Sequence, residues 1–173
     1  MPSTIHWRAA PLLVLAACAP ALDWREVGIG DAGLIAQFPC RPQHETRDVA
    51  VAGQAVHMQM AACTVDETHY AISFFTLDDP AGVTRAIEAL RAAAIANVGG
   101  VPALARPFTL NGTTPNAAAT RLAIDGHGPD GRPLHLHTAV FTRGRQVYQV
   151  SAVGQTPSNE GVEEFFSGLR IKS

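Results

Sequence analysis

The chain has 173 residues, of which 47% are apolar and 16% are charged, and its formal net charge is −2 at pH 7. This length fits one domain of ordinary size, and the apolar content is sufficient to bury a core, which excludes a disordered chain. The slight acidic excess excludes an electrostatic nucleic-acid binder, which would carry a basic face. Three cysteines are too few for a disulfide-dense scaffold, and no apolar run approaches the roughly 18 residues that a transmembrane helix needs.

The N-terminal segment, residues 1–17, combines a weakly cationic start with a short apolar stretch of the length found in signal peptides. The four residues Leu15–Cys18 resemble the lipobox of bacterial lipoprotein precursors, in which a Leu and two small residues precede an invariant cysteine. The resemblance implies that residues 1–17 are removed and that Cys18 is acylated, which would give a stable anchor of two or three acyl chains. The alternative is an ordinary secretory signal cut after Ala21, but Pro20 makes that site a poor one.

A glycine motif follows at Gly28–Gly33 and matches the dinucleotide-binding pattern G-x-G-x-x-G. That pattern binds a pyrophosphate only where it opens a helix. Here the next segment, Leu34–Phe38, alternates briefly and stops at Pro39. We therefore expect a glycine-rich hairpin and no nucleotide site.

Two segments, Arg47–Val51 and Gln54–Val65, are predicted to form a β-hairpin because apolar and polar residues alternate on both sides of a two-residue turn. If the residues that flank the turn face each other, Cys63 lies opposite a position two residues from Cys40. We therefore predict a Cys40–Cys63 disulfide. In an exported protein this pair would leave Cys18 as the odd cysteine, which lipidation would consume.

The next strand is predicted at Thr68–Leu77, where aromatic and aliphatic residues alternate with polar ones. A helix is predicted to follow, with Asp79 as its N-cap, Pro80 as its first residue and Gly99–Gly100 as its end. Apolar residues at steps of three and four predict the buried stripe of this helix: Val83, Ile87, Leu90, Ala94 and Val98.

The remaining chain contains two further predicted hairpins and a second, shorter helix. One hairpin joins Arg106–Leu110 to Ala118–Asp125 through Asn111–Gly112, and the other joins Leu134–Thr142 to Gln146–Val153. Thr156–Pro157 is expected to cap a helix that carries Val162, Phe165 and Phe166, and Leu169–Ile171 is expected to add a closing strand. This order predicts an α+β fold, an antiparallel sheet packed with two main helices.

The order of elements, together with Phe38–Pro42 and the closing segment Phe165–Ile171, resembles bacterial exported proteins of the PsbP-like group. The resemblance implies an α/β/α sandwich and a non-catalytic role in assisting a membrane complex or binding a partner. It carries over no site residue. We expect a tether over residues 18–23 and a single domain over residues 24–173.

Three histidines are the candidate metal ligands. His135 and His137 share one face of a predicted strand, a spacing that can chelate zinc or copper. A third ligand would have to come from His127 in the preceding loop, with Asp125 or Asp130 as a carboxylate ligand. Two imidazoles do not make a site, so we expect surface histidines and predict no metal and no cofactor.

The register of this histidine pair depends on the turn that follows it. A two-residue turn at Arg143–Gly144 would set His135 and His137 opposite Ala152 and Val150, and a three-residue loop would set them opposite Val153 and Ser151. The sequence leaves both alternatives open.

No catalytic motif is present: the sequence contains no G-x-S-x-G, no H-E-x-x-H and no phosphate loop. Cys63 with His57 or His69 would resemble a thiol-dependent site, but pairing with Cys40 would remove the nucleophile.

We therefore expect a lipoprotein of the bacterial envelope, facing the periplasm from the outer membrane, with a non-catalytic binding role. Its expected partners are membrane lipid, through acylated Cys18, and an envelope protein, with no nucleic acid. The alternatives are a periplasmic carrier of a small ligand or metal, and a hydrolase.

Overall fold

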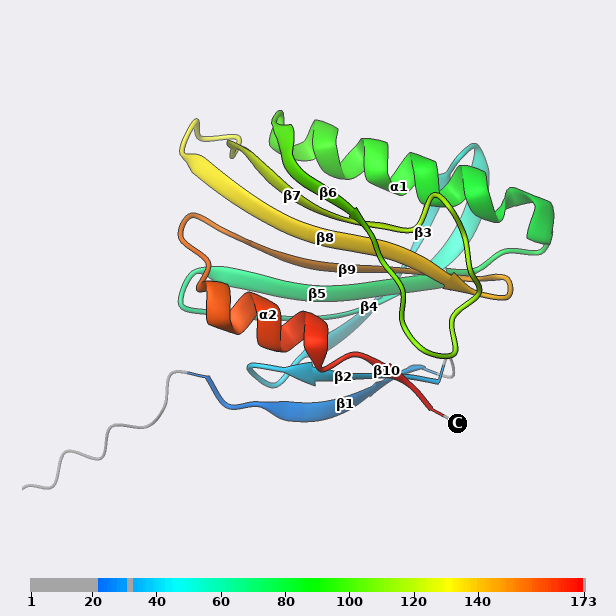
Figure 1. The fold of residues 1–173 in the computed structure, drawn as a ribbon, viewed down its shortest axis with the longest axis horizontal. Coiled ribbons are helices and arrows are strands. Elements are labelled where there is room, and N and C mark those ends of the chain that lie inside the picture. The colour runs from blue at the N-terminus through cyan, green and yellow to red at the C-terminus, as the bar shows by residue number, and fades with distance from the viewer. Residues whose placement is uncertain (1–21, 31–32, 173) are drawn as a thin grey trace, which may run out of the picture.

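The strands of the molecule form two antiparallel sheets (Figure 1), and the computed structural model describes residues 22–30 and 33–172. The predicted signal peptide and Cys18 lie outside the described residues. The seven-stranded sheet has the order β3-β4-β5-β9-β8-β7-β6 and the three-stranded sheet the order β1-β2-β10. The strands are β1 Arg25–Ile29, β2 Leu34–Phe38, β3 Gln43–Val51, β4 Gln54–Val65, β5 Thr68–Thr76, β6 Val101–Pro107, β7 Thr120–His127, β8 Pro133–Arg143, β9 Gln146–Gly154 and β10 Arg170–Ile171. The helices are the 3₁₀ helix η2 Pro80–Gly82, α1 Val83–Val98 and α2 Asn159–Ser167.

The glycine motif lies in the β1–β2 hairpin, as expected, and β10 pairs with the other edge of β2. The β3–β4 hairpin has the predicted register, with Val51 opposite Gln54. This register brings Cys40 to Cys63, and the predicted disulfide is present with the two Cα atoms 6.0 Å apart. Because Cys40 follows β2 and Cys63 lies in β4, the disulfide links the small sheet to the large one.

All five residues of the predicted helical stripe are buried in α1, and Gly99 ends the helix with a positive φ of 57°. Asp79 and Pro80 do begin a helical segment, as predicted, but its first turn is the 3₁₀ helix η2 and not part of α1. The Asp79 side chain accepts a hydrogen bond from the Ala81 N–H at 2.9 Å and so caps η2, and α1 begins at Val83. Proline fits the first turn of either kind of helix, so the sequence signal does not separate them.

The predicted hairpin around Asn111–Gly112 is wrong. The β7 strand pairs with β6, which contains only Arg106 and Pro107 of the predicted first strand, and residues 108–119 form a long connection. The Asn-Gly turn does form, because the Thr113 N–H donates to the Leu110 carbonyl at 3.1 Å. However, Phe108 turns inward to pack against Phe141, with the ring centroids 5.3 Å apart. The local turn signal is therefore correct, but no strands extend from it.

Neither register considered for the β8–β9 hairpin is correct. The two-residue turn lies one position later than predicted, at Gly144–Arg145, and sets His135 opposite Gly154 and His137 opposite Ala152. Gly144 adopts a φ of 58°, which suits the first position of such a turn. The turn is held in place because the Arg145 guanidinium donates to the Leu77 carbonyl at 3.2 Å and to the Asp78 carbonyl at 3.0 Å.

The two α-helices cover opposite faces of the seven-stranded sheet. Val140 of β8 packs in the cluster with α1, whereas its neighbours Ala139 and Phe141 pack in the cluster with α2. Helix α2 is capped by Ser158, whose hydroxyl oxygen accepts from the Gly161 N–H at 3.3 Å, so the predicted Thr156–Pro157 cap is wrong by one residue.

The α+β prediction is confirmed, and the PsbP-like sandwich stays a prediction. Within the described ranges, no helix has both the length and the apolar content required to span a bilayer.

Candidate functional site

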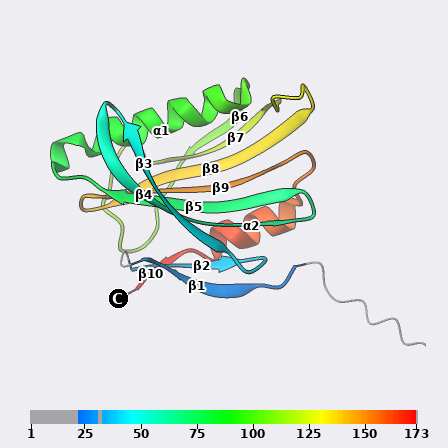
Figure 2. The same cartoon turned by 180° about the vertical axis from the view of Figure 1, so that it is seen from behind.

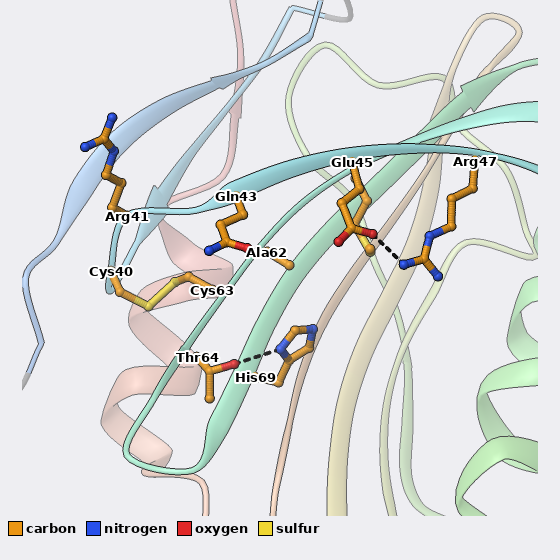
Figure 3. Close-up of a pocket in the computed structure, with 10 residues that line it drawn as sticks. Cys40, Arg41, Gln43, Glu45, Arg47, Ala62, Cys63, Thr64 and His69 are labelled. Carbon is orange, nitrogen blue, oxygen red and sulfur yellow. Dashed lines mark hydrogen bonds and ion pairs between the residues drawn. A yellow bond between two sulfur atoms is a disulfide. The ribbon is translucent and has the colours of Figure 1, made fainter.

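A hollow of about 570 Å³ lies at the disulfide end of the β3–β4 hairpin (Figure 3), and we name it the disulfide-end hollow. Its volume is within the range typical of small-ligand sites. It is lined by Cys40, Arg41, Gln43, Glu45, Arg47, Met60, Ala62, Cys63, Thr64 and His69. The lining thus combines charged and neutral polar groups with the apolar surface of the methionine and the disulfide.

The strand register explains which side chains line this hollow. Gln43 and Glu45 are two positions apart in β3, so their side chains share one face of the strand. They lie opposite Ala62 and Met60 of β4. Figure 3 shows the disulfide at one end and an ion pair between Glu45 and Arg47 at the other. This pair has an N–O distance of 2.6 Å, and both of its side chains are largely exposed. The hollow is therefore open and polar, which suits binding of a surface group more than chemistry in a closed site.

One further contact in this hollow joins Thr64 and His69 on neighbouring strands. The Thr64 hydroxyl and the His69 Nδ1 lie 3.0 Å apart. Cys63 is in the disulfide, so the thiol-dependent arrangement with His57 or His69 has no nucleophile. His57 instead forms a cross-strand pair with Asp48, with 2.6 Å between Nδ1 and the carboxylate oxygen.

The start of the described chain lies beside the disulfide-end hollow. The Asp23 N–H donates to the Pro39 carbonyl at 2.8 Å, which places the first strand next to Cys40. Leu22 lies next to Gly161, in the first turn of α2. The segment that precedes β1 is therefore fixed between the disulfide and the start of α2.

A second hollow, of about 360 Å³, holds the predicted histidine pair, and we name it the histidine hollow. It is lined by Asp125, His135, His137, Thr156, Pro157 and Asn159. His135 Nδ1 and the Asp125 carboxylate lie 2.7 Å apart. Burial lowers the pKa of His137 below its ordinary value, and the nearby Arg121 guanidinium lowers it further. His137 is consequently biased toward the neutral imidazole.

The three predicted histidines do not converge. His127 is the last residue of β7 and not part of a loop, because β7 pairs with β8 as far as His127 and Pro133. It does not line the histidine hollow. Among the residues that the structure describes, no group of three or more His, Cys, Asp or Glu side chains is placed to hold a metal ion. The structure brings His135 and His137 together with Asp125, as an imidazole pair beside a carboxylate.

A buried arginine next to this hollow was not predicted. The side chain of Arg121 on β7 is 7% exposed and donates two hydrogen bonds to the Glu163 carboxylate of α2, at 3.0 and 2.5 Å. Its guanidinium carbon also lies 4.0 Å from the centroid of the Phe166 ring. The hydrogen bonds to Arg121 hold the pKa of Glu163 below its ordinary value. An arginine within the alternating strand Ala118–Asp125 is the one sequence signal that points to this contact.

Comparisons with known proteins give no assignment. No protein-family model matches the chain, and no curated protein matches it. A solved structure of a Pseudomonas aeruginosa protein of unknown function is 12% identical, with 81% of this chain and 86% of that chain covered and a TM-score of 0.38. A likeness at this level carries no argument about fold or function.

Proposed function

We propose that this chain is a lipid-anchored protein of the bacterial envelope, with a non-catalytic binding role at the periplasmic surface of the membrane. The observation that carries the proposal is the position of the disulfide-end hollow beside the start of the described chain, four residues after Cys18. Its expected partners are membrane lipid, through acylated Cys18, and an envelope protein that reaches the hollow.

The cysteines support an exported, lipid-anchored protein. Cys40 and Cys63 form a disulfide, which is typical of oxidising compartments such as the bacterial periplasm. This pairing uses two of the three cysteines and leaves Cys18, which the resemblance to a lipobox identifies as the acylated residue.

The short tether supports a role close to the membrane. Four residue steps separate Cys18 from Leu22, and they extend to about 14 Å at most. Acylated Cys18 would therefore hold Leu22 near the lipid headgroups, together with the adjoining disulfide. The near-neutral charge of the chain offers no polybasic attraction to anionic lipid, so the acyl chains would supply the anchor.

The anchor is tested by intact-mass analysis of the membrane-extracted protein and of Cys18→Ser. We expect the unmodified protein to begin at Cys18 and to carry two or three acyl chains, and Cys18→Ser to keep its signal peptide or to leave the membrane. An unmodified chain that begins at Leu22 would show that the signal is an ordinary secretory one.

The binding surface is tested separately, with a photo-reactive residue placed at Gln43 in the disulfide-end hollow. The matched control places it at Arg85, in the first turn of α1, at the opposite end of the molecule from the start of β1 (Figure 1). In intact cells, crosslinks to one defined envelope protein are expected from Gln43 and not from Arg85. A flexible linker of about thirty residues after Ala21 should weaken them, because it lowers the effective concentration of the hollow at the membrane. Equal crosslinking from both positions would contradict the assignment of this surface.

The volume of the same hollow favours a second candidate function, a small-ligand carrier. A hollow of about 570 Å³ accommodates a drug-sized molecule. Native mass spectrometry of the protein extracted from cells distinguishes the candidates. A carrier would retain a non-covalently bound small molecule, and Cys18→Ser, which lacks the acyl chains, would retain it too.

A further inference from the structure

A tight turn lies at residues 110–113, within the long connection between β6 and β7, and its two central residues are exposed. The Thr113 N–H donates to the Leu110 carbonyl at 3.1 Å, and the Thr113 hydroxyl donates to the same oxygen at 2.6 Å. Gly112 has a φ of 85°, whereas the φ of Asn111 is not positive. A glycine with positive φ at the third position is the signature of a type II turn, with Asn111 at the second position.

Contacts on both sides hold the base of this turn against the sheet. Before the turn, the Phe108 N–H donates to the Ala119 carbonyl at 3.1 Å, and the Phe108 ring packs on Phe141. After the turn, the Thr114 N–H donates to the Thr142 carbonyl at 2.7 Å. The fold therefore fixes where the turn lies but leaves the two residues at its tip in solvent.

The tip carries the two groups that react in asparagine deamidation. Within the described ranges, no hydrogen bond involves the Asn111 side chain or the Gly112 N–H. Gly112 has no side chain that could shield its backbone nitrogen. Type I and type II turns interconvert by rotation of the peptide between their two central residues. The same rotation is needed for the Gly112 nitrogen to reach the Asn111 side chain, so the turn permits the reaction without unfolding.

The other asparagines of the chain lack this arrangement. The Asn116 side chain is held at both ends, because its amide donates to the Thr84 hydroxyl oxygen at 3.1 Å and its oxygen accepts from a backbone N–H at 2.9 Å. Asn97 and Asn159 lie in α1 and α2, where the helical backbone fixes the peptide that follows them. All three are followed by a residue with a side chain. Asn111 alone combines a following glycine with an exposed turn.

We propose that Asn111 is a site of spontaneous deamidation in the folded protein. The Gly112 backbone nitrogen attacks the side-chain carbonyl carbon of Asn111, and a C–N bond forms. The side-chain nitrogen leaves as ammonia and takes the Gly112 amide proton with it. Water then cleaves one of the two bonds between the imide nitrogen and its carbonyl carbons. The products are aspartate and isoaspartate, and each adds one negative charge to the turn.

The isoaspartate product has a structural consequence at the end of the chain. Its main chain runs through the former side chain and is one methylene longer, which disrupts the hydrogen bond that closes the turn. A Cβ on Gly112 would lie 3.2 Å from the Ile171 Cβ, so the turn is in close contact with β10. Strand β10 pairs with β2 through two residues only. We therefore expect isoaspartate to increase hydrogen exchange in residues 110–113 and in β10 but not in α1.

The test is incubation of the purified full chain in mildly alkaline buffer, followed by tandem mass spectrometry that assigns each change to its residue. We expect Asn111 to gain the mass difference between NH and O over time, with isoaspartate among the products, and Asn116 to stay unchanged. Mildly acidic buffer should slow the reaction, because the attacking nitrogen has to lose its proton. Asn111→Gln is the matched variant and should lose the reaction, since attack on its longer side chain has to close a larger ring.

The same incubation in urea separates the effect of the fold from that of the Asn-Gly sequence. Isoaspartate at Asn111 in both the folded and the urea-unfolded chain supports the proposal. Isoaspartate in the unfolded chain alone would show that the folded turn blocks the attack and would overturn it. Equal rates at Asn111 and Asn116 in the folded chain, aspartate without isoaspartate, or an undiminished reaction in folded Asn111→Gln would overturn it as well.

Discussion

The two faces of the seven-stranded sheet are built in different ways. The face under α1 is largely aliphatic, with Phe75 as an aromatic exception, and one continuous helix covers it with residues such as Ile87 and Leu90 packed on Val140 and Val147. The opposite face is much richer in aromatic rings, and the segments that cover it come from distant parts of the chain. Its rings belong to Trp24, Phe38, Tyr70, Phe74, Phe108, Phe141, Tyr148, Phe165 and Phe166. The first face therefore depends on local helical periodicity, whereas the second depends on long-range contacts that must hold several segments together.

The largest expected effect is at the centre of the aromatic face. Phe165 is fully buried and contacts Phe38, Tyr70 and Phe166, with ring centroids 5.2, 5.1 and 5.8 Å away. Phe165→Ala should lower the free energy of unfolding by about 4 kcal/mol, and Ile87→Ala on the α1 face by about 3 kcal/mol. Urea unfolding of both variants measures the difference. A larger loss in Ile87→Ala would show that the aromatic face is not the more demanding of the two.

The next largest effect concerns the disulfide that links the sheets. The two cysteines are 23 positions apart in the sequence. For a loop of this length, removing the disulfide is predicted to lower the free energy of unfolding by about 3 kcal/mol and the melting temperature by several degrees. The double variant Cys40→Ser, Cys63→Ser is compared with the unmodified protein by calorimetry. Hydrogen exchange should increase in β1, β2 and β3 more than in α1, because the disulfide joins the small sheet to the β3–β4 hairpin. Free thiols at both positions in the protein extracted from cells would contradict the disulfide itself.

The difference between the two faces also explains what the sequence predicted. The stripe of α1 and the register of β3–β4 were predictable because a period of 3.6 residues and a two-residue turn are local signals. The Arg121–Glu163 pair spans 42 positions, and no local pattern connects its partners. The shift of the β8–β9 turn to Gly144–Arg145 has a similar cause, since Arg145 is held by carbonyls 67 and 68 positions away. The hollows likewise combine residues from separate segments. The sequence brought His135, His137 and Asp125 together as candidates, but not Thr156, Pro157 and Asn159, which come from the segment around the start of α2.

A smaller effect is expected at the ion pair that attaches α2 to β7. Glu163→Gln removes the charge that satisfies buried Arg121 and should cost about 1–2 kcal/mol, between the values typical of exposed and of buried pairs. The neighbouring Glu164→Gln is the matched control, because Glu164 is exposed on the same helix. Equal stability of the two variants in urea unfolding would show that the Arg121 contact contributes nothing to the docking of α2.

The smallest effect is the pH dependence that His137 gives to the aromatic face. Burial holds the pKa of His137 below its ordinary value of 6.5, and Arg121 and His135 act in the same direction, while Glu163 and Asp125 oppose them. Folding therefore favours the neutral imidazole, so its contribution to stability is complete above pH 6.5 and is lost as the pH falls toward the lower pKa of the folded state. His137→Gln should flatten the fall in stability between about pH 7.5 and 5.5, a window above the range in which carboxylates such as Glu163 titrate. The exposed His127→Gln is the control, measured by urea unfolding in matched buffers. An unchanged slope in His137→Gln would show that this imidazole does not couple the fold to pH, and the same flattening in His127→Gln would show that the coupling is not specific to the buried position.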